Sequence, residues 1–185
     1  MASMSENETH TVNIAGIERQ LRKMEVAPGV KIAVLNILGD TELVQAAARA
    51  LAPKLPPEAQ FIVTAEAKSI PLAFALSVET KLPYIVLRKS QKPYMGNVLT
   101  AETLSITTNK PQTLFLDEKD RNEIKGKKVV LLDDVISTGS TLQGMRLIMQ
   151  KAEAEIVGEA AILTEGDRAK WQNIISLGHL PVFGG

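Results

Sequence analysis

The segment that most restricts the fold is an uninterrupted apolar run, residues 129–132, that leads into two adjacent acids, Asp133 and Asp134. A run without polar alternation predicts a strand that is covered on both faces, as in a parallel sheet with helices on either side. A turn rich in Ser, Thr and Gly follows, and residues 141–152 then carry apolar side chains at helical spacing. This segment therefore predicts a strand, a turn and a helix of an α/β fold.

Other segments repeat the alternation of strand and helix. An Ala-rich run, residues 43–51, predicts a helix that has Asp40 as its N-cap and ends before Pro53, and residues 70–81 predict a second helix. Because strands alternate with helices, we expect an α/β fold in which a parallel twisted sheet is flanked by helices. The remaining predicted strands are the apolar, β-prone runs at residues 61–64, 83–87 and 156–163.

Residues 90–112 interrupt this alternation. They are polar and rich in Thr, they contain two prolines, and they alternate weakly between Val98 and Thr107. This pattern predicts a long excursion in the form of an extended hairpin. Loops of this length in compact domains are often functional.

Composition restricts the class of protein. The 185 residues suit one domain, and 21 basic residues balance 21 acidic ones, so the net charge of zero disfavours a protein that coats nucleic acid or an anionic membrane. The chain has no Cys, which excludes disulfides and thiolate sites, and only two His, His10 and His179, which disfavours a histidine metal centre. No apolar stretch is long enough to span a membrane, and no signal peptide pattern is present, so a cytoplasmic location is expected.

The residues after the two acids indicate a phosphate site. Backbone N–H groups and the helix dipole converge at the start of a helix, Gly139 permits close approach of a ligand, and the neighbouring hydroxyls add donors. Asp133 and Asp134 are placed to accept hydrogen bonds from sugar hydroxyls or to hold a metal through water. The segment thus predicts a site for a ribose 5-phosphate at the carboxyl edge of the sheet. The alternative, a Ser/Thr N-cap that binds nothing, is disfavoured by the length of the pattern.

The string from Val129 to Thr141 closely resembles the phosphoribosyl pyrophosphate (PRPP) motif of the type I phosphoribosyltransferases, and the resemblance extends from about Pro28 to Phe183. It implies the fold of that family, with a small N-terminal hood (about residues 11–38), a core (about 39–185) and an extended lid loop (about 89–112). Residues 1–10 are expected to be a disordered or tag-derived N-terminus before a single phosphoribosyltransferase domain at 11–185.

The resemblance also implies roles for individual residues. Asp133 and Asp134 would hold the ribose and Mg²⁺, with the metal bound mostly through PRPP and water. Residues 64–70 resemble the pyrophosphate loop, which contains a non-proline cis peptide, here on one side or the other of Ala67, and Lys68 would meet the pyrophosphate. Asp133, Asp134, Lys68 and Arg88 form the predicted catalytic set. The predicted PRPP-binding residues add Val135, Ser137, Thr138, Gly139, Ser140, Thr141, Ala67 and Lys89.

The resemblance points to the purine branch, with adenine as the favoured base and AMP as the product. Val30, Lys31 and Ile32 resemble the hood segment whose backbone grips adenine, and residues 177–183 resemble the C-terminal strand of the adenine enzymes. Ala33 stands where those enzymes carry Arg, and Thr108 stands where they carry a loop Glu. Xanthine and hypoxanthine or guanine are therefore alternative bases.

A third alternative is a regulator that senses PRPP without catalysis. The presence of Lys68 and Arg88 favours an enzyme instead. The expected partners are PRPP and a purine base, without nucleic acid or membrane, and relatives with the Arg88-Lys89 pair imply a homodimer. His179 is expected to be a loop residue, and Trp171 and Phe183 to be core or interface aromatics.

Overall fold

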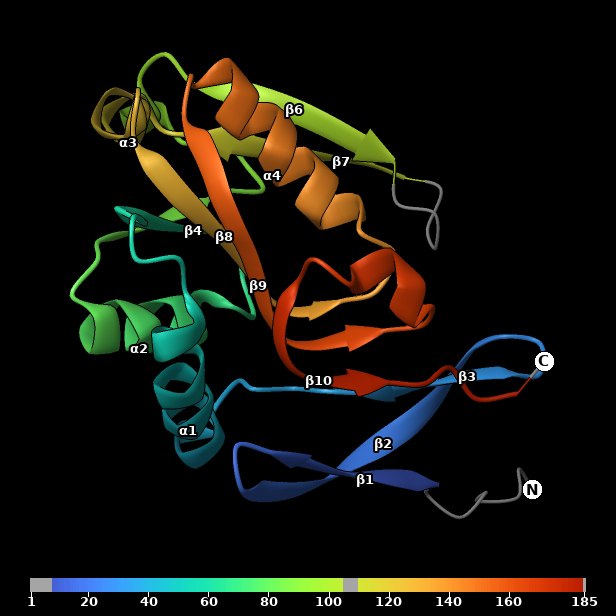
Figure 1. Cartoon of the computed structure of the whole chain (residues 1–185). Coiled ribbons are helices and arrows are strands. Elements are labelled where there is room, and N and C mark those ends of the chain that lie inside the picture. Colours follow the sequence, from blue (N-terminus) through green and yellow to red (C-terminus); the bar gives the residue numbers. More distant parts are fainter. Residues whose placement is uncertain (1–7, 105–109, 185) are drawn as a thin grey trace.

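The computed structural model describes residues 8–104 and 110–184. A five-stranded sheet forms its centre, and all of the strands in this sheet run parallel (Figure 1). Each strand leaves the sheet at its carboxyl end through a loop or helix, so these ends gather along one edge. In spatial order the strands are β10 (Ile175–Leu180), β9 (Glu155–Glu165), β8 (Lys128–Ile136), β4 (Phe61–Ala65) and β5 (Tyr84–Leu87).

The two faces of the sheet are covered by different elements (Figure 1). Helices α1 (Thr41–Leu51) and α2 (Ile70–Thr80) pack on one face together with the N-terminal strands. Helix α4 (Ser140–Lys151) and a hairpin pack on the other face. This arrangement confirms the predicted α/β fold with helices on both sides. Short helices complete the chain at η1 (Ala52–Lys54), η2 (Pro93–Met95), α3 (Glu118–Ile124) and η3 (Arg168–Trp171).

The two predicted helices and the central strand agree with the structure, apart from their ends. Asp40 caps α1, because its carboxylate accepts a hydrogen bond from the Leu43 backbone N–H at 3.2 Å. Strand β8 differs in one respect. The sequence places its two acids at the end of the strand, whereas β8 continues through them to Ile136, because Asp133 pairs with Ala161 of β9. The acids therefore have the fixed geometry of a paired strand.

The hood is a three-stranded antiparallel sheet of β1 (Thr9–Ile14), β2 (Ile17–Ala27) and β3 (Val30–Val34). Thr9 and His10 belong to β1, although the sequence predicts a disordered start up to residue 10. An ion pair ties the hood to the core: the Arg19 guanidinium donates to both oxygens of Asp40 at 2.8 and 2.9 Å. Arg19 lowers the pKa of the Asp40 carboxyl, so both groups stay charged at neutral pH.

The expected lid contains an ordered hairpin, β6 (Leu99–Leu104) paired with β7 (Pro111–Leu116). Ala101, Leu114 and Leu116 are buried in the core between this hairpin and α4, so the base of the hairpin is anchored by packing. Thr108, at the position expected for the family's Glu, lies outside the described residues. Within the described ranges, no helix combines the length and apolar character that a membrane span requires.

The packing of the hairpin on α4 generates a stability prediction. A Cβ atom at Gly144 would lie 3.0 Å from the Thr103 methyl group and 3.1 Å from a Leu114 methyl group. We expect Gly144→Val to lower the free energy of unfolding by about 1–3 kcal/mol, because its branched side chain overpacks this contact. Urea denaturation measures the change. The control is Gln143→Val at an exposed position of the same helix, where a change within about 0.5 kcal/mol is expected; equal values for the two variants would contradict the packing.

Candidate active site

The loop between β8 and α4 forms a pocket of about 220 Å³ at the carboxyl edge of the sheet. Gly139 has a φ of 83° and is the N-cap of α4, so the predicted glycine stands where a left-handed residue is required. The hydroxyls of Thr138 and Ser140 lie 3.1 Å apart. Backbone N–H groups at the start of α4 and these hydroxyls give the pocket the donors that a phosphate needs. Its lining residues are Gln112, Asp133, Val135, Ile136, Ser137, Thr138, Gly139, Ser140, Thr141 and Leu142.

Trp171 closes this loop from outside. A Cβ atom at Gly139 would lie only 2.8 Å from the Cη2 atom of the indole, so the ring packs directly on the glycine. The indole N–H is fixed by donating to the Glu165 carbonyl at 2.9 Å. The sequence predicts a core or interface aromatic here, and the structure packs the Trp171 ring against the loop between β8 and α4.

Asp133 and Asp134 lie in β8, two or three residues before it ends at Ile136, and Asp133 lines the pocket. Asp133 accepts hydrogen bonds from the Asp134 backbone N–H at 2.8 Å and from the Ser69 hydroxyl at 3.3 Å. Burial, and after it the adjacent Asp134 carboxyl, raises the pKa of Asp133 well above its ordinary value. Two carboxyl groups this close favour the arrival of a cation or of hydroxyl donors.

The loop after β4 brings a cation to the same acids. Its Glu66–Ala67 peptide bond is cis, which confirms the predicted cis peptide next to Ala67. The Lys68 ammonium lies 3.8 Å from an Asp134 carboxylate oxygen, and about half of the Lys68 side chain is exposed (47%). The structure thus brings together Lys68 and Asp134, two members of the predicted catalytic set, from the loop after β4 and the neighbouring strand β8.

Arg88 and Lys89 lie at the end of β5, and Glu66 links them to the loop after β4. One Glu66 carboxylate oxygen accepts from the Arg88 Nε at 3.1 Å and from the Lys89 backbone N–H at 2.8 Å. Arg88 also donates to the Tyr94 hydroxyl at 3.1 Å. The Lys89 backbone N–H, and to a smaller extent Arg88, hold the pKa of Glu66 below its ordinary value. Both basic residues are therefore linked to the loop after β4 by a carboxylate that the sequence did not single out.

The predicted base-binding segment is engaged in pairing. The backbone N–H of Lys31 donates to the Phe183 carbonyl at 2.8 Å, and the Lys31 carbonyl accepts from the Phe183 N–H at 2.9 Å, so the Lys31 N–H is not free to grip a base in this structure. Val30 and Ile32 lie in β3, in register with Ala27 and Met24 of β2. Ala33 is buried, so the position where the adenine enzymes carry Arg holds a core residue here.

A second pocket, of about 580 Å³, adjoins this hood pairing at the ends of β9 and β10. His179 lies in β10 instead of a loop, with Nδ1 2.8 Å from the Thr164 hydroxyl and Nε2 2.9 Å from the Gly166 carbonyl. Nε2 must donate to that carbonyl, so both nitrogens of the ring are engaged. The pocket is lined by Gly166, Asp167, Arg168, His179, Pro181 and Val182.

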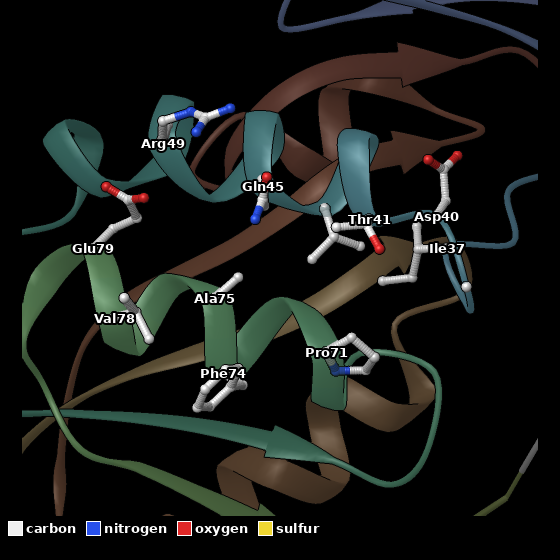
Figure 2. A pocket seen from close by; sticks show the side chains of 12 residues that line it. Ile37, Asp40, Thr41, Gln45, Arg49, Pro71, Phe74, Ala75, Val78 and Glu79 are labelled. Carbon is white, nitrogen blue, oxygen red and sulfur yellow. The ribbon is translucent and has the colours of Figure 1, made fainter.

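A groove of about 350 Å³ separates α1 from α2 (Figure 2). Arg49 and Glu79 lie at one of its ends, and Asp40 and Pro71 lie at the other. Phe74 of α2 contributes an exposed aromatic side chain. None of the predicted PRPP-binding residues lines this groove, so its position separates it from the phosphate pocket.

The sequence patterns did not assign four residues to the site: Glu66, Ser69, Gln112 and Trp171. Glu66 and Ser69 lie inside the segment that resembles the pyrophosphate loop, so their position next to Ala67 and Lys68 in the sequence could have identified them. Gln112 and Trp171 carry no such signal, because Gln112 lines the pocket from β7 and Trp171 packs on Gly139 from η3.

Comparison with known families agrees with this site. Residues 36–175 match the phosphoribosyl transferase domain family, and the chain belongs to that family. The match covers the central sheet, the phosphate loop and the acids. The fold is that of the type I phosphoribosyltransferases, as the sequence motif predicted.

Two relatives in sequence are hypoxanthine/guanine phosphoribosyltransferases. That of Methanococcus voltae is 39% identical over 106 residues, which are 57% of this chain and 53% of the relative. That of Methanocaldococcus vulcanius is 36% identical over 109 residues, which are 59% and 56% of the two chains. The chain therefore spans about half the length of the curated relatives it matches.

Solved structures of similar fold include two adenine phosphoribosyltransferases. The enzyme of Thermoanaerobacter pseudethanolicus gives a TM-score of 0.70 at 19% identity and covers 86% of this chain and 95% of its own. That of Rhodothermus marinus gives 0.64 at 21% identity, with 92% and 93% covered. At these identities the similarity concerns the fold.

The Glu66 contacts generate a prediction on pH. Because the folded protein holds the pKa of Glu66 below its ordinary value, the carboxylate stabilises the fold above that ordinary value, and this contribution is lost as the pH falls through the lowered pKa. We expect Glu66→Gln to be less stable than the parent by about 1 kcal/mol at pH 7. This difference should shrink as the pH is lowered from 7 to about 3, because the carboxylate becomes protonated.

Urea denaturation between those two pH values measures this effect. Glu79→Gln, on the exposed surface of α2, serves as the control and should show little difference at either pH. A Glu66→Gln deficit that stays constant across the pH range would contradict a role for the charged carboxylate.

Proposed function

We propose that the protein is a purine phosphoribosyltransferase, which joins a purine base to PRPP and releases pyrophosphate. One observation carries this proposal. The phosphate loop at the start of α4, the Asp133–Asp134 pair and the Lys68 loop meet at one edge of the sheet in a chain of the phosphoribosyl transferase domain family. Their donors, acceptors and cation match the phosphate, ribose hydroxyls and pyrophosphate of PRPP in that order.

The phosphate loop would bind the 5-phosphate. Ser137, Thr138, Ser140 and Thr141 surround Gly139 in the lining of the 220 Å³ pocket. A phosphate there accepts hydrogen bonds from backbone N–H groups and hydroxyls, and the dipole of α4 adds a favourable field. The neutral character of these donors explains how a chain of zero net charge can hold an anion locally.

Asp133 and Asp134 would accept hydrogen bonds from the ribose hydroxyls. The raised pKa of Asp133 reflects burial and repulsion from its neighbour, and hydroxyl donors or a cation would relieve that repulsion. Their two hard carboxylates are a donor set that suits Mg²⁺. Within the described ranges no cluster of three or more His, Cys, Asp or Glu could hold a metal, so the other ligands would come from PRPP and water. When bound, Mg²⁺ would neutralise charge on the pyrophosphate.

Lys68, Arg88 and Lys89 would stabilise the departing pyrophosphate. Arg88 uses Nε and one Nη in its contacts with Glu66 and Tyr94, and a guanidinium has five N–H donors, so several remain for a phosphate. The Lys89 backbone N–H is engaged by Glu66, which leaves its ammonium as the group that meets substrate. Glu66 would orient both residues toward the leaving group.

In the reaction, a ring nitrogen of the base forms a bond to C1 of the ribose as the bond from C1 to the pyrophosphate oxygen breaks. The pyrophosphate leaves with the electron pair, and the base loses its N–H proton to solvent. Positive charge develops on the ribose ring, as in glycosyl transfer generally. The residues of this chain would act by holding the reactants in line and by stabilising charge on the leaving group.

We propose a 6-oxopurine, hypoxanthine or guanine, as the base. Relatives at 36–39% identity carry that name, and the buried Ala33 lacks the Arg expected of an adenine enzyme. Adenine is the second candidate, because the two segments that resemble the adenine enzymes, residues 28–32 and 177–183, meet through the pairing of Lys31 with Phe183.

One assay tests both proposals. The protein is incubated with PRPP and Mg²⁺ and with adenine, hypoxanthine, guanine or xanthine in separate reactions, and pyrophosphate release is measured. We expect the fastest release with hypoxanthine or guanine. Preference for adenine or xanthine would overturn the choice of base but not the activity, whereas no release with any base would overturn the activity itself.

A substitution tests the role of the ribose site. Asp134→Asn removes the charge that faces Lys68 while it keeps the shape of the side chain. We expect turnover to fall by about tenfold or more and PRPP binding to weaken, since a charged hydrogen-bond acceptor is lost. Steady-state kinetics measure both effects. Glu58→Gln, which makes the same carboxylate-to-amide change at an exposed position away from the acid pair, is the control, and unchanged kinetics of Asp134→Asn would refute the assignment.

A further inference from the structure

The phosphate pocket has one wall that does not belong to the PRPP motif. Nine of its ten lining residues come from the segment between Asp133 and Leu142. The tenth is Gln112, which lies in β7 of the hairpin. The hairpin therefore contributes a side chain to a pocket that the motif alone would leave open on that side.

The register of the hairpin explains how Gln112 reaches the pocket. Gln112 pairs with Thr103, and residues directly opposite in an antiparallel pair share a face. Thr103 and Leu114 both pack toward Gly144 in the first turns of α4. Because side chains alternate along a strand, Gln112 shares this face with Leu114, and Thr113 points the other way.

Gln112 is held there by the protein and not by a ligand. Its neighbours on the same face, Thr103 and Leu114, are buried at 7% and 1% exposure, and Leu114 and Ala101 belong to the core beneath α4. The packing of Leu114 against α4 and the pairing of β7 with β6 thus fix the position of β7 relative to the start of α4. Gln112 thus lines the same pocket as Gly139 and Ser140.

We propose that Gln112 donates its side-chain amide N–H to the 5-phosphate of PRPP, opposite the donors of the loop. This inference rests on the proposed function. An amide offers two N–H donors without adding charge, which matches the neutral donors on the facing wall. The hairpin is then part of the phosphate site, and Gln112 fixes the orientation of the phosphate from the side that α4 does not reach.

Binding measurements by calorimetry test this role. The ligands are PRPP, ribose 5-phosphate and inorganic pyrophosphate with Mg²⁺, and the variants are Gln112→Ala, Gln112→Glu and the control Thr113→Glu. We expect Gln112→Glu to raise the Kd of ribose 5-phosphate by about tenfold or more, because it replaces a donor by a like charge, and Gln112→Ala to raise it by about threefold to tenfold. Thr113→Glu, which adds the same charge on the opposite face of β7, should change it by less than about twofold.

Pyrophosphate binding separates a local role from a general loss of structure. Inorganic pyrophosphate has no 5-phosphate group, so its Kd should be the same in all variants if Gln112 acts on that group alone. Equal affinity of the parent and Gln112→Glu for ribose 5-phosphate would overturn the inference, and so would an equal loss for both ligands. If the unaltered protein binds neither PRPP nor ribose 5-phosphate, both the proposed function and the role of Gln112 are wrong. If the unaltered protein binds both ligands and the Gln112 variants bind them equally well, only the role of Gln112 is wrong.

Discussion

Strand β8 is buried on both faces, and this burial determines where the polar groups of the site can lie. Val130 and Leu132 join the core under α1 and α2, while Val129 and Leu131 join the core under α4. Polar side chains of β8 are tolerated only beyond the part of the strand that these helices cover, at the carboxyl edge of the sheet. Parallel strands end at the same edge, so the loops after β4, β5 and β8 bring their polar residues to one place.

Hydrogen bonds between neighbouring strand ends hold this edge in shape. The Thr64 hydroxyl of β4 donates to the Leu132 carbonyl of β8 at 2.7 Å, and Ser69 donates to Asp133. In the described part of the chain, no buried side-chain nitrogen or oxygen lacks a hydrogen-bond partner. A fully satisfied polar network in a poorly solvated setting is rigid. The acids and the loops beside them are therefore positioned before a substrate binds.

The sequence predicted those parts of the molecule in which structure and function follow from neighbouring residues. Residues 129–141 contain the apolar run, the acids, the glycine and the hydroxyls within one continuous string, so strand, turn and helix could be inferred together. The cis peptide beside Ala67, which the structure contains, came from the resemblance of an equally short string, and so did the proposed roles of Lys68 and Arg88.

The parts that the sequence missed depend on distant partners. Strand β2 carries charged residues on its exposed face, and its place is fixed by pairing with β1 and β3 and by the Arg19–Asp40 ion pair. The role of Glu66 requires the Lys89 backbone N–H, 23 residues later in the chain. Gln112 and Trp171 reach the phosphate loop from elements on either side of it. No local pattern reports such contacts, because they arise only when the sheet and its covering elements have assembled.

The contact between Trp171 and Gly139 makes the protein its own optical reporter. Trp171 is the single tryptophan of the chain, and its ring packs on the glycine at which the phosphate loop turns into α4. All of the indole fluorescence therefore originates beside one loop, without background from other tryptophans. A ligand that enters the loop changes the polarity and packing around that ring, so occupancy of the pocket can be followed in the unlabelled protein in real time.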